Sequence, residues 1–107
     1  MKWLELEEIK QQLRIEPDYH DEDSLLKRYG DSAESAILNI TGRTYEELVA
    51  MNPLGENKIP ADIWEATVML VNMSYEHRSP VSMQNLYSNP AFDMKIKPYI
   101  RLANKNE

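Results

Sequence analysis

The chain has 107 residues, a formal net charge of −6 and no cysteine. This length leaves room for one domain with one modest core and so excludes a two-domain enzyme. The lack of cysteine excludes disulfides, iron–sulfur clusters and cysteine-ligated zinc. Strong helix formers far outnumber valine, isoleucine and threonine, so residues 1–107 are predicted to form one all-α domain, a small bundle of four to five helices.

The acidic excess is confined to the first half of the chain. Residues 1–50 carry 12 acidic and 6 basic side chains, whereas residues 51–107 carry 6 of each. A protein that grips duplex DNA needs lysine and arginine to displace counterions from the phosphates, so this balance argues against specific DNA binding. The acidic N-terminus and the short apolar runs also predict neither a leader peptide nor membrane association.

Two helices are predicted in the first half. Apolar residues at spacings of three and four predict a short amphipathic helix over 4–14 and a longer one over 22–41. Thr41 and Gly42 are typical of a left-handed end to the longer helix. Gly30 lies inside that helix, where it is either a tolerated surface residue or a point at which another helix approaches closely. Both interpretations of Gly30 stay open at this level.

Two further helices follow. The motif Thr-Tyr-Glu-Glu at 44–47 has the pattern of a capping box, in which the Thr44 hydroxyl and the Glu47 carboxylate each accept a backbone N–H. It predicts a helix of two turns that ends ahead of an Asn-Pro pair. A proline then suits the first turn of the next helix, which is predicted over 60–78.

Apolar residues surround most of the helix predicted over 60–78. One stripe consists of Ile63, Ala66, Leu70 and Met73, and a second consists of Trp64, Val68, Val71 and Tyr75. A helix of this kind is either central in its fold or shared with another chain. Because so small a domain has difficulty covering both stripes, we expect the second stripe to meet a second subunit in part.

The end of this helix offers a further candidate interface residue. Tyr75, Glu76 and Arg78 fall within one helical turn. They form either a helix-end ion pair, which contributes little at a surface, or an interface anchor, because tyrosine and arginine are frequent in binding hot spots. Arg78 therefore joins the candidate interface residues, with both interpretations open.

Residues 79–97 show no sustained helical or strand period and are interrupted by prolines, so they are predicted to form a long extended arm. This segment carries more apolar side chains than a solvent-exposed loop without a function would, which indicates that it binds a partner. Its residues expected at an oligomer interface are Leu86, Tyr87, Phe92 and Met94. After the arm, a short docked turn is predicted over 96–102 and a frayed tail over 103–107.

No motif for catalysis or for metal binding stands out. Four carboxylates precede the second helix but lack the calcium-loop pattern, so their predicted role is helix capping: Asp18, Asp21, Glu22 and Asp23. The two histidines, His20 and His77, have no partner at ligand spacing. No serine lies in a nucleophile motif and the three glycines are isolated. We therefore expect no enzyme activity, no metal and no cofactor.

An ordered set of short motifs runs along nearly the whole chain. The motifs are Gln12-Leu13-Arg14-Ile15, Asp18-x-x-Asp21-Glu22-Asp23, Asn39-Ile40-Thr41-Gly42-Arg43, Ile59-Pro60-x-Asp62-Ile63, Tyr75-Glu76-x-Arg78 and Pro98-Tyr99-Ile100-Arg101. In this order they resemble the head–tail connector family of long-tailed phages. The resemblance implies a small helical virion protein that assembles into a homo-oligomeric ring beneath the portal and forms part of the DNA channel.

The resemblance also implies the portal and tail-completion proteins as partners, the virion as location, and the host cytoplasm during assembly. A ring needs two different patches on each subunit, and the doubly apolar helix and the arm are candidates. An acidic lining suits a DNA conduit because it repels phosphates. Two other hypotheses remain: a small helical adaptor or regulator that binds a host protein through residues 79–97, and a DNA-binding regulator, which the net charge disfavours.

Overall fold

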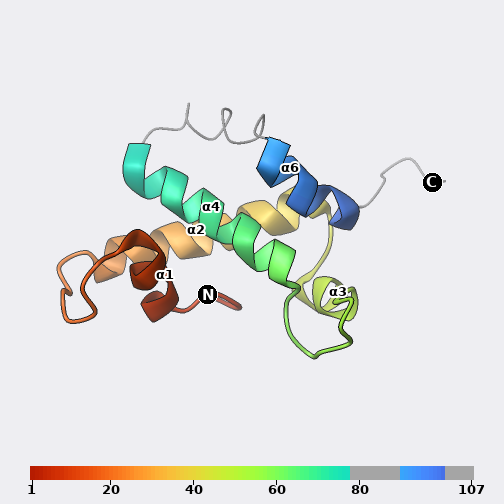
Figure 1. The fold of residues 1–107 in the computed structure, drawn as a ribbon, viewed down its shortest axis with the longest axis horizontal. Helices are drawn as coiled ribbons and strands as arrows, with labels where there is room; N and C mark the ends of the chain where they lie inside the picture. The colour runs from red at the N-terminus through yellow and green to blue at the C-terminus, as the bar shows by residue number, and fades with distance from the viewer. Residues whose placement is uncertain (78–89, 101–107) are drawn as a thin grey trace.

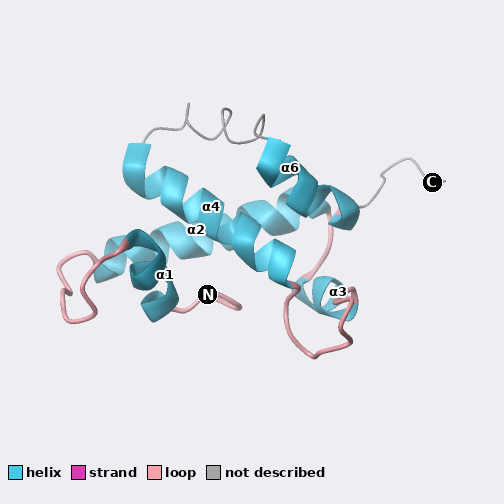
Figure 2. Cartoon of the chain, in the orientation of Figure 1, coloured by secondary structure: helices cyan, strands magenta, loops and turns pink. Residues whose placement is uncertain are grey.

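The computed structural model describes residues 1–77 and 90–100, and the described residues form helices joined by turns and loops, without a strand (Figure 2). The all-α prediction is therefore confirmed. The elements are α1 (Leu6–Leu13), α2 (Asp23–Thr41), α3 (Tyr45–Ala50), α4 (Ala61–His77), α6 (Pro90–Ile96) and the 3-10 helix η1 (Lys97–Tyr99). None of the helices in this part of the chain is long and apolar enough to cross a bilayer.

Helices α2 and α4 form the centre of the bundle. They cross, and each of the other long segments packs against one or both of them: α1 lies on α2 and α4, and α6 lies on α4 (Figure 1). The core between them consists of Leu4, Ile9, Leu26, Ala33, Ile37, Leu48, Ile59, Ile63, Ala66, Leu70, Val71, Phe92, Ile96 and Tyr99. Burial of these apolar side chains is the main force that holds the bundle together.

The helix ends follow the sequence signals. Gly42 ends α2 in the left-handed region at φ 69°, as the Thr-Gly pair predicts. At the start of α3, the Thr44 hydroxyl accepts the N–H of Glu47 at 3.1 Å, and the Glu47 carboxylate accepts the N–H of Thr44 at 2.9 Å. The predicted capping box is therefore confirmed. Helix α4 begins directly after Pro60.

Gly30 is a point of close approach and not a surface residue. It is buried on α2, and a Cβ atom there would overlap the Met1 sulfur and lie 3.2 Å from the Ile9 side chain of α1. The missing side chain therefore lets α1 and the N-terminal residue pack directly on α2. Of the two interpretations that the sequence left open, the structure selects the close approach of another helix.

The prediction of an extended arm over 79–97 is wrong for residues 90–97, because residues 90–96 form α6 and η1 begins at Lys97. Phe92 and Ile96 lie four residues apart, on one face of α6, and both are buried. Packing on α4 stabilises this seven-residue helix, which is too short to reveal a helical period in the sequence. The docked turn predicted over 96–102 corresponds in part to η1. Arg78, Leu86, Tyr87 and the predicted tail lie outside the described residues.

Candidate functional site

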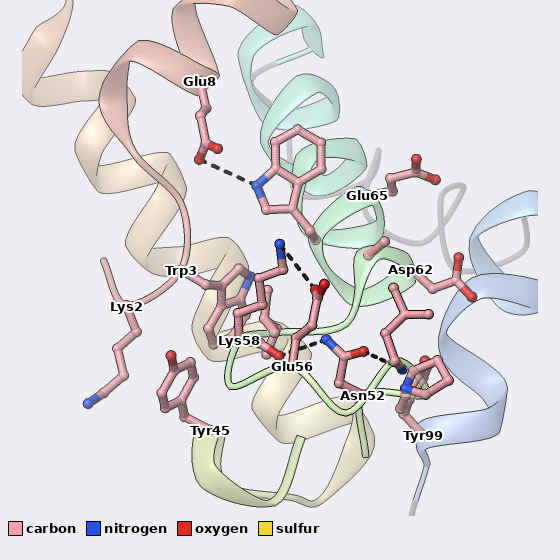
Figure 3. A pocket seen from close by; sticks show the side chains of 15 residues that line it. Lys2, Trp3, Glu8, Tyr45, Asn52, Glu56, Lys58, Asp62, Glu65 and Tyr99 are labelled. Carbon is pink, nitrogen blue, oxygen red and sulfur yellow. Dashed lines mark hydrogen bonds and ion pairs between the residues drawn. The ribbon is translucent and has the colours of Figure 1, made fainter. Parts of the chain in front are cut away.

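A groove of about 780 Å³ opens beside the first half of α4 (Figure 3). Its walls come from the N-terminal residues, from α1, from α3, from the loop between α3 and α4, from the first turns of α4 and from Tyr99 of η1. These segments are far apart in the sequence, and the packing of α1 and α4 on α2 brings them together. The groove is therefore a product of the tertiary fold.

One wall of the groove consists of residues 2 and 3, which are held by a buried carboxylate. Glu34 of α2 is only 5% exposed. Its two oxygens accept the backbone N–H groups of Lys2 at 2.6 Å, Trp3 at 2.9 Å and Leu4 at 2.8 Å. Hydrogen bonds to an ionised acceptor are about twice as strong as neutral ones. Glu34 therefore fixes the course of the N-terminal segment across the bundle.

Trp3 continues this wall with an aromatic surface. Its indole Nε1 donates to the buried Thr67 hydroxyl of α4 at 2.9 Å. Its ring stacks on Tyr45 of α3, with centroids 5.9 Å apart and planes 6° apart. The Lys2 ammonium lies 5.6 Å from the Tyr45 ring centroid, within the range of a cation–π contact. The three side chains join the N-terminal segment to α3 and α4.

Trp64, a predicted interface residue, lines the opposite part of the groove. Its indole Nε1 donates to Oε1 of Glu8 in α1 at 3.4 Å. The same Glu8 oxygen accepts the N–H of Glu5 and so also caps α1. The indole is half-buried, which leaves part of its apolar ring for a molecule in the groove.

The loop between α3 and α4 presents an exposed leucine at the groove. Asn52 shapes this loop, because its amide donates to the carbonyl of Lys58 at 3.0 Å and its Oδ1 accepts the N–H of Leu54 at 2.9 Å. Gly55 adopts a left-handed φ of 71°, which favours glycine. The Leu54 side chain is 77% exposed, so a fixed loop holds an apolar group in solvent.

Acidic groups predominate around the groove. Four carboxylates and two ammonium groups line it, namely Glu8, Glu56, Asp62, Glu65, Lys2 and Lys58. Glu65 also binds Lys95 of α6 at 2.6 Å, and this hydrogen bond raises the pKa of the Lys95 ammonium. Burial, together with the nearby Asp62 charge, raises the pKa of the Tyr99 hydroxyl. A cationic partner would therefore be favoured at the rim.

The other predicted interface residues fall into three groups. Val71 and Phe92, at 2% and 3% exposure, are buried in the core of the single chain and offer no surface to a second copy. Val68 and Tyr75 are half-buried, and the Tyr75 hydroxyl donates to Glu22 at 2.7 Å. Met94 of α6 is 75% exposed. Arg78, Leu86 and Tyr87 lie beyond the described ranges.

The acidic cluster lies at the N-terminal end of α2, with Glu22 at the N-cap and Asp23 in the first turn. Glu22 is the N-cap residue, yet its side chain makes no capping hydrogen bond. Asp23 instead pairs with the buried Lys10 of α1 at 2.8 Å and with His20 at 2.9 Å. Their hydrogen bonds lower the pKa of Asp23. Lys10 also donates to the carbonyl of Tyr19 at 2.7 Å, so the cluster holds the loop before α2 against α1.

No metal site emerges from this cluster or from the rest of residues 1–77 and 90–100, where no three histidine or acidic side chains converge.

The groove-forming role of Glu34 was missed at the level of sequence. The available signal is its position four residues after Gly30, on the face of α2 that otherwise carries the buried residues. A glutamate on such a face needs a buried partner.

The family model for the phage gp6-like head-tail connector protein matches residues 4–101, and the chain belongs to this family. Neither a curated protein nor a solved structure matches the chain. The resemblance deduced from the ordered motifs is therefore confirmed, and membership of the family supports a structural connector role in the phage virion.

Proposed function

We propose that this connector is a non-enzymatic protein that assembles with copies of itself into a ring beneath the portal. The ring contributes to the channel through which DNA passes without specific binding. Its other partners are the portal and the tail-completion proteins, and it assembles in the host cytoplasm before it becomes part of the virion. Membership of the connector family supports this role.

The observation that carries the proposal is apolar surface that the described chain leaves uncovered. Leu54 and Met94 are 77% and 75% exposed, and Trp64 and Val68 on α4 are half-buried. Soluble monomers rarely keep large apolar patches in solvent, and such patches mark contacts between proteins. The four residues lie on three different elements, as an interface made of two unlike patches requires.

The mass of the purified protein over a series of concentrations tests self-assembly. Sedimentation velocity is expected to show a defined oligomer that grows at the expense of the monomer, and electron microscopy is expected to show closed rings. A protein that stays monomeric at the highest concentration, alone and with purified portal, would contradict the proposal. The net charge of −6 further predicts no salt-sensitive binding to a DNA duplex in fluorescence anisotropy.

The alternative of a small adaptor that binds a host protein through residues 79–97 keeps less support. Its basis was an extended apolar arm, but residues 90–96 are helical and bury Phe92 and Ile96 on the bundle. Within the described residues, the apolar side chain that this segment still exposes strongly is Met94. A pull-down that recovers a host protein and no phage component would favour the adaptor.

A further inference from the structure

The two most exposed large apolar side chains of the described residues lie on unlike surfaces. Leu54 belongs to the loop that follows α3, at the groove, and Met94 belongs to α6. Figure 1 shows α3 with its loop on one side of the first half of α4 and α6 on the other side. Each copy of the protein therefore presents two exposed apolar groups on different elements, one at the groove and one on α6.

The groove beside Leu54 has room and chemistry for a flexible apolar side chain. Its volume of about 780 Å³ exceeds that of one side chain and is in the range of sites that enclose small ligands. Trp3, Tyr45 and Trp64 supply aromatic surface in it. A methionine is well suited to such a place, because its thioether is polarizable and contacts aromatic rings favourably.

The surface of α6 complements the groove in polarity and carries one ammonium group close to the exposed methionine. Met94, Lys97 and Pro98 are exposed at spacings of three and four, which places them on one side of α6 and η1. The opposite side of α6 is fixed to the core by Phe92 and Ile96. The Lys97 ammonium therefore accompanies Met94, with the exposed Asp93 carboxylate four residues before Lys97. Of the four carboxylates in the groove, Glu56 pairs with Lys58 and Glu65 with Lys95, which leaves Glu8 and Asp62 against the Lys2 ammonium.

We propose that the groove of one copy receives Met94 of a neighbouring copy, with Lys97 of that neighbour beside the acidic rim. This inference rests on the proposed self-assembly and specifies its contact. Because the two surfaces differ, each copy offers its groove to one neighbour and its α6 to another. A contact of this kind repeats in one direction and closes into a ring when the rotation between copies allows it.

Cysteine cross-linking tests the contact directly, because the chain has no cysteine of its own. Leu54→Cys and Met94→Cys are exposed replacements and are expected to leave the fold intact. A mixture of the two single variants should give a cross-linked dimer under mild oxidation. The double variant should give a ladder of covalent multimers, because each copy then carries both halves of the contact.

The controls separate this contact from assembly in general. Ser35→Cys, an exposed position on α2 outside the groove, mixed with Met94→Cys should give no dimer. Oligomers of the right mass without a 54–94 cross-link would overturn the contact and leave self-assembly standing. Dimers from either single variant alone would indicate a symmetric contact and would also overturn it. A cross-link from Leu54→Cys to the portal, instead of to a second copy, would overturn the contact as well.

A charge variant gives an independent measurement. Met94→Glu places a carboxylate against the acidic groove. The protein concentration at which half of the chains are assembled should therefore rise at least about tenfold, as expected for the loss of a hot-spot residue. Ser35→Glu makes the same change in net charge at a distant exposed position and should leave assembly unchanged. Equal effects of the two variants would contradict the contact. A strict monomer in the wild type would overturn the proposed self-assembly as well.

Discussion

The N-terminal segment and α6 are both added to the central pair of helices, but a different interaction predominates in each attachment. Hydrogen bonds from three backbone N–H groups to the buried Glu34 carboxylate hold the N-terminal segment, together with the burial of Leu4. Burial of Phe92 and Ile96 holds α6, together with the ion pair between Lys95 and Glu65. Hydrogen bonds are directional and fix a backbone without filling the space beside it, whereas apolar packing succeeds only when it fills that space. The groove accordingly lies next to the N-terminal segment.

The same difference explains what each region shows to solvent. Beside the N-terminal segment, Trp3 and Trp64 have their indole N–H groups bonded within the chain and direct aromatic surface into the groove. Helix α6 is covered on its inner side and exposes Met94 on its outer side. The N-terminal region thus borders a groove, and α6 presents an exposed methionine.

The largest effect is expected from the apolar attachment. Phe92→Ala removes a ring that is 3% exposed and should lower the free energy of unfolding by about 4 kcal/mol, because the lost burial is joined by the cost of a cavity. Urea denaturation measures this loss. Phe92→Leu, which keeps most of the volume, should cost about 1–1.5 kcal/mol. A loss below about 1 kcal/mol for the alanine variant would show that α6 is not held by this side chain.

A somewhat smaller effect is expected from the polar attachment. Glu34→Ala leaves three backbone N–H groups without their acceptor and should cost about 3 kcal/mol, since water reaches part of the segment once it detaches. Amide hydrogen exchange should show lost protection at residues 2–4 in this variant but not in Phe92→Ala. Glu34→Gln, which keeps one acceptor oxygen, should cost about 1–2 kcal/mol. Unchanged exchange at residues 2–4 would contradict the assigned role.

The smallest effect is expected at the acidic loop, and it depends on pH. Lys10 and His20 hold the pKa of Asp23 below its ordinary value of 3.8 in the folded chain. The stability from this pair is therefore present above about pH 4 and is lost as the pH falls through the folded pKa. Asp23→Asn should be less stable than the wild type at neutral pH, and the difference should shrink in acid.

Urea denaturation at a series of pH values measures this difference. Asp18→Asn, at an exposed position in the same loop, controls for the loss of a surface charge. The Phe92→Ala deficit should stay constant over the same pH range, because it comes from apolar burial. A constant difference between Asp23→Asn and the wild type down to about pH 2 would contradict the stabilising ion pair.

The helices and their ends were predictable because their signals are local. Thr44 and Glu47 are three residues apart and satisfy each other's N–H groups, and Gly42 ends α2 by its own backbone preference. Pro60, directly before α4, marks the first turn of that helix. Such patterns involve neighbours within one turn, so no tertiary contact is needed to interpret them.

The site was less predictable because its contacts join distant segments. Trp64 was identified as an interface candidate from its position on the second apolar stripe, and it does line the groove. Val71 was placed at the surface by the same stripe and Phe92 by the predicted apolar arm, but the structure buries both. A helical stripe tells which residues are apolar and share a face; it does not tell which neighbouring helix covers that face.

The sequence by itself determined that this chain is helical, where most of its helices begin and end, and to which family it belongs. Only the tertiary structure decided that Gly30 admits α1, that Glu34 binds the N-terminal backbone, and that α6 packs on α4. The physical reason is the separation along the chain over which each kind of interaction acts. Capping and helical periodicity act within a few residues, whereas burial and the partners of buried charges depend on segments that meet only in the folded chain.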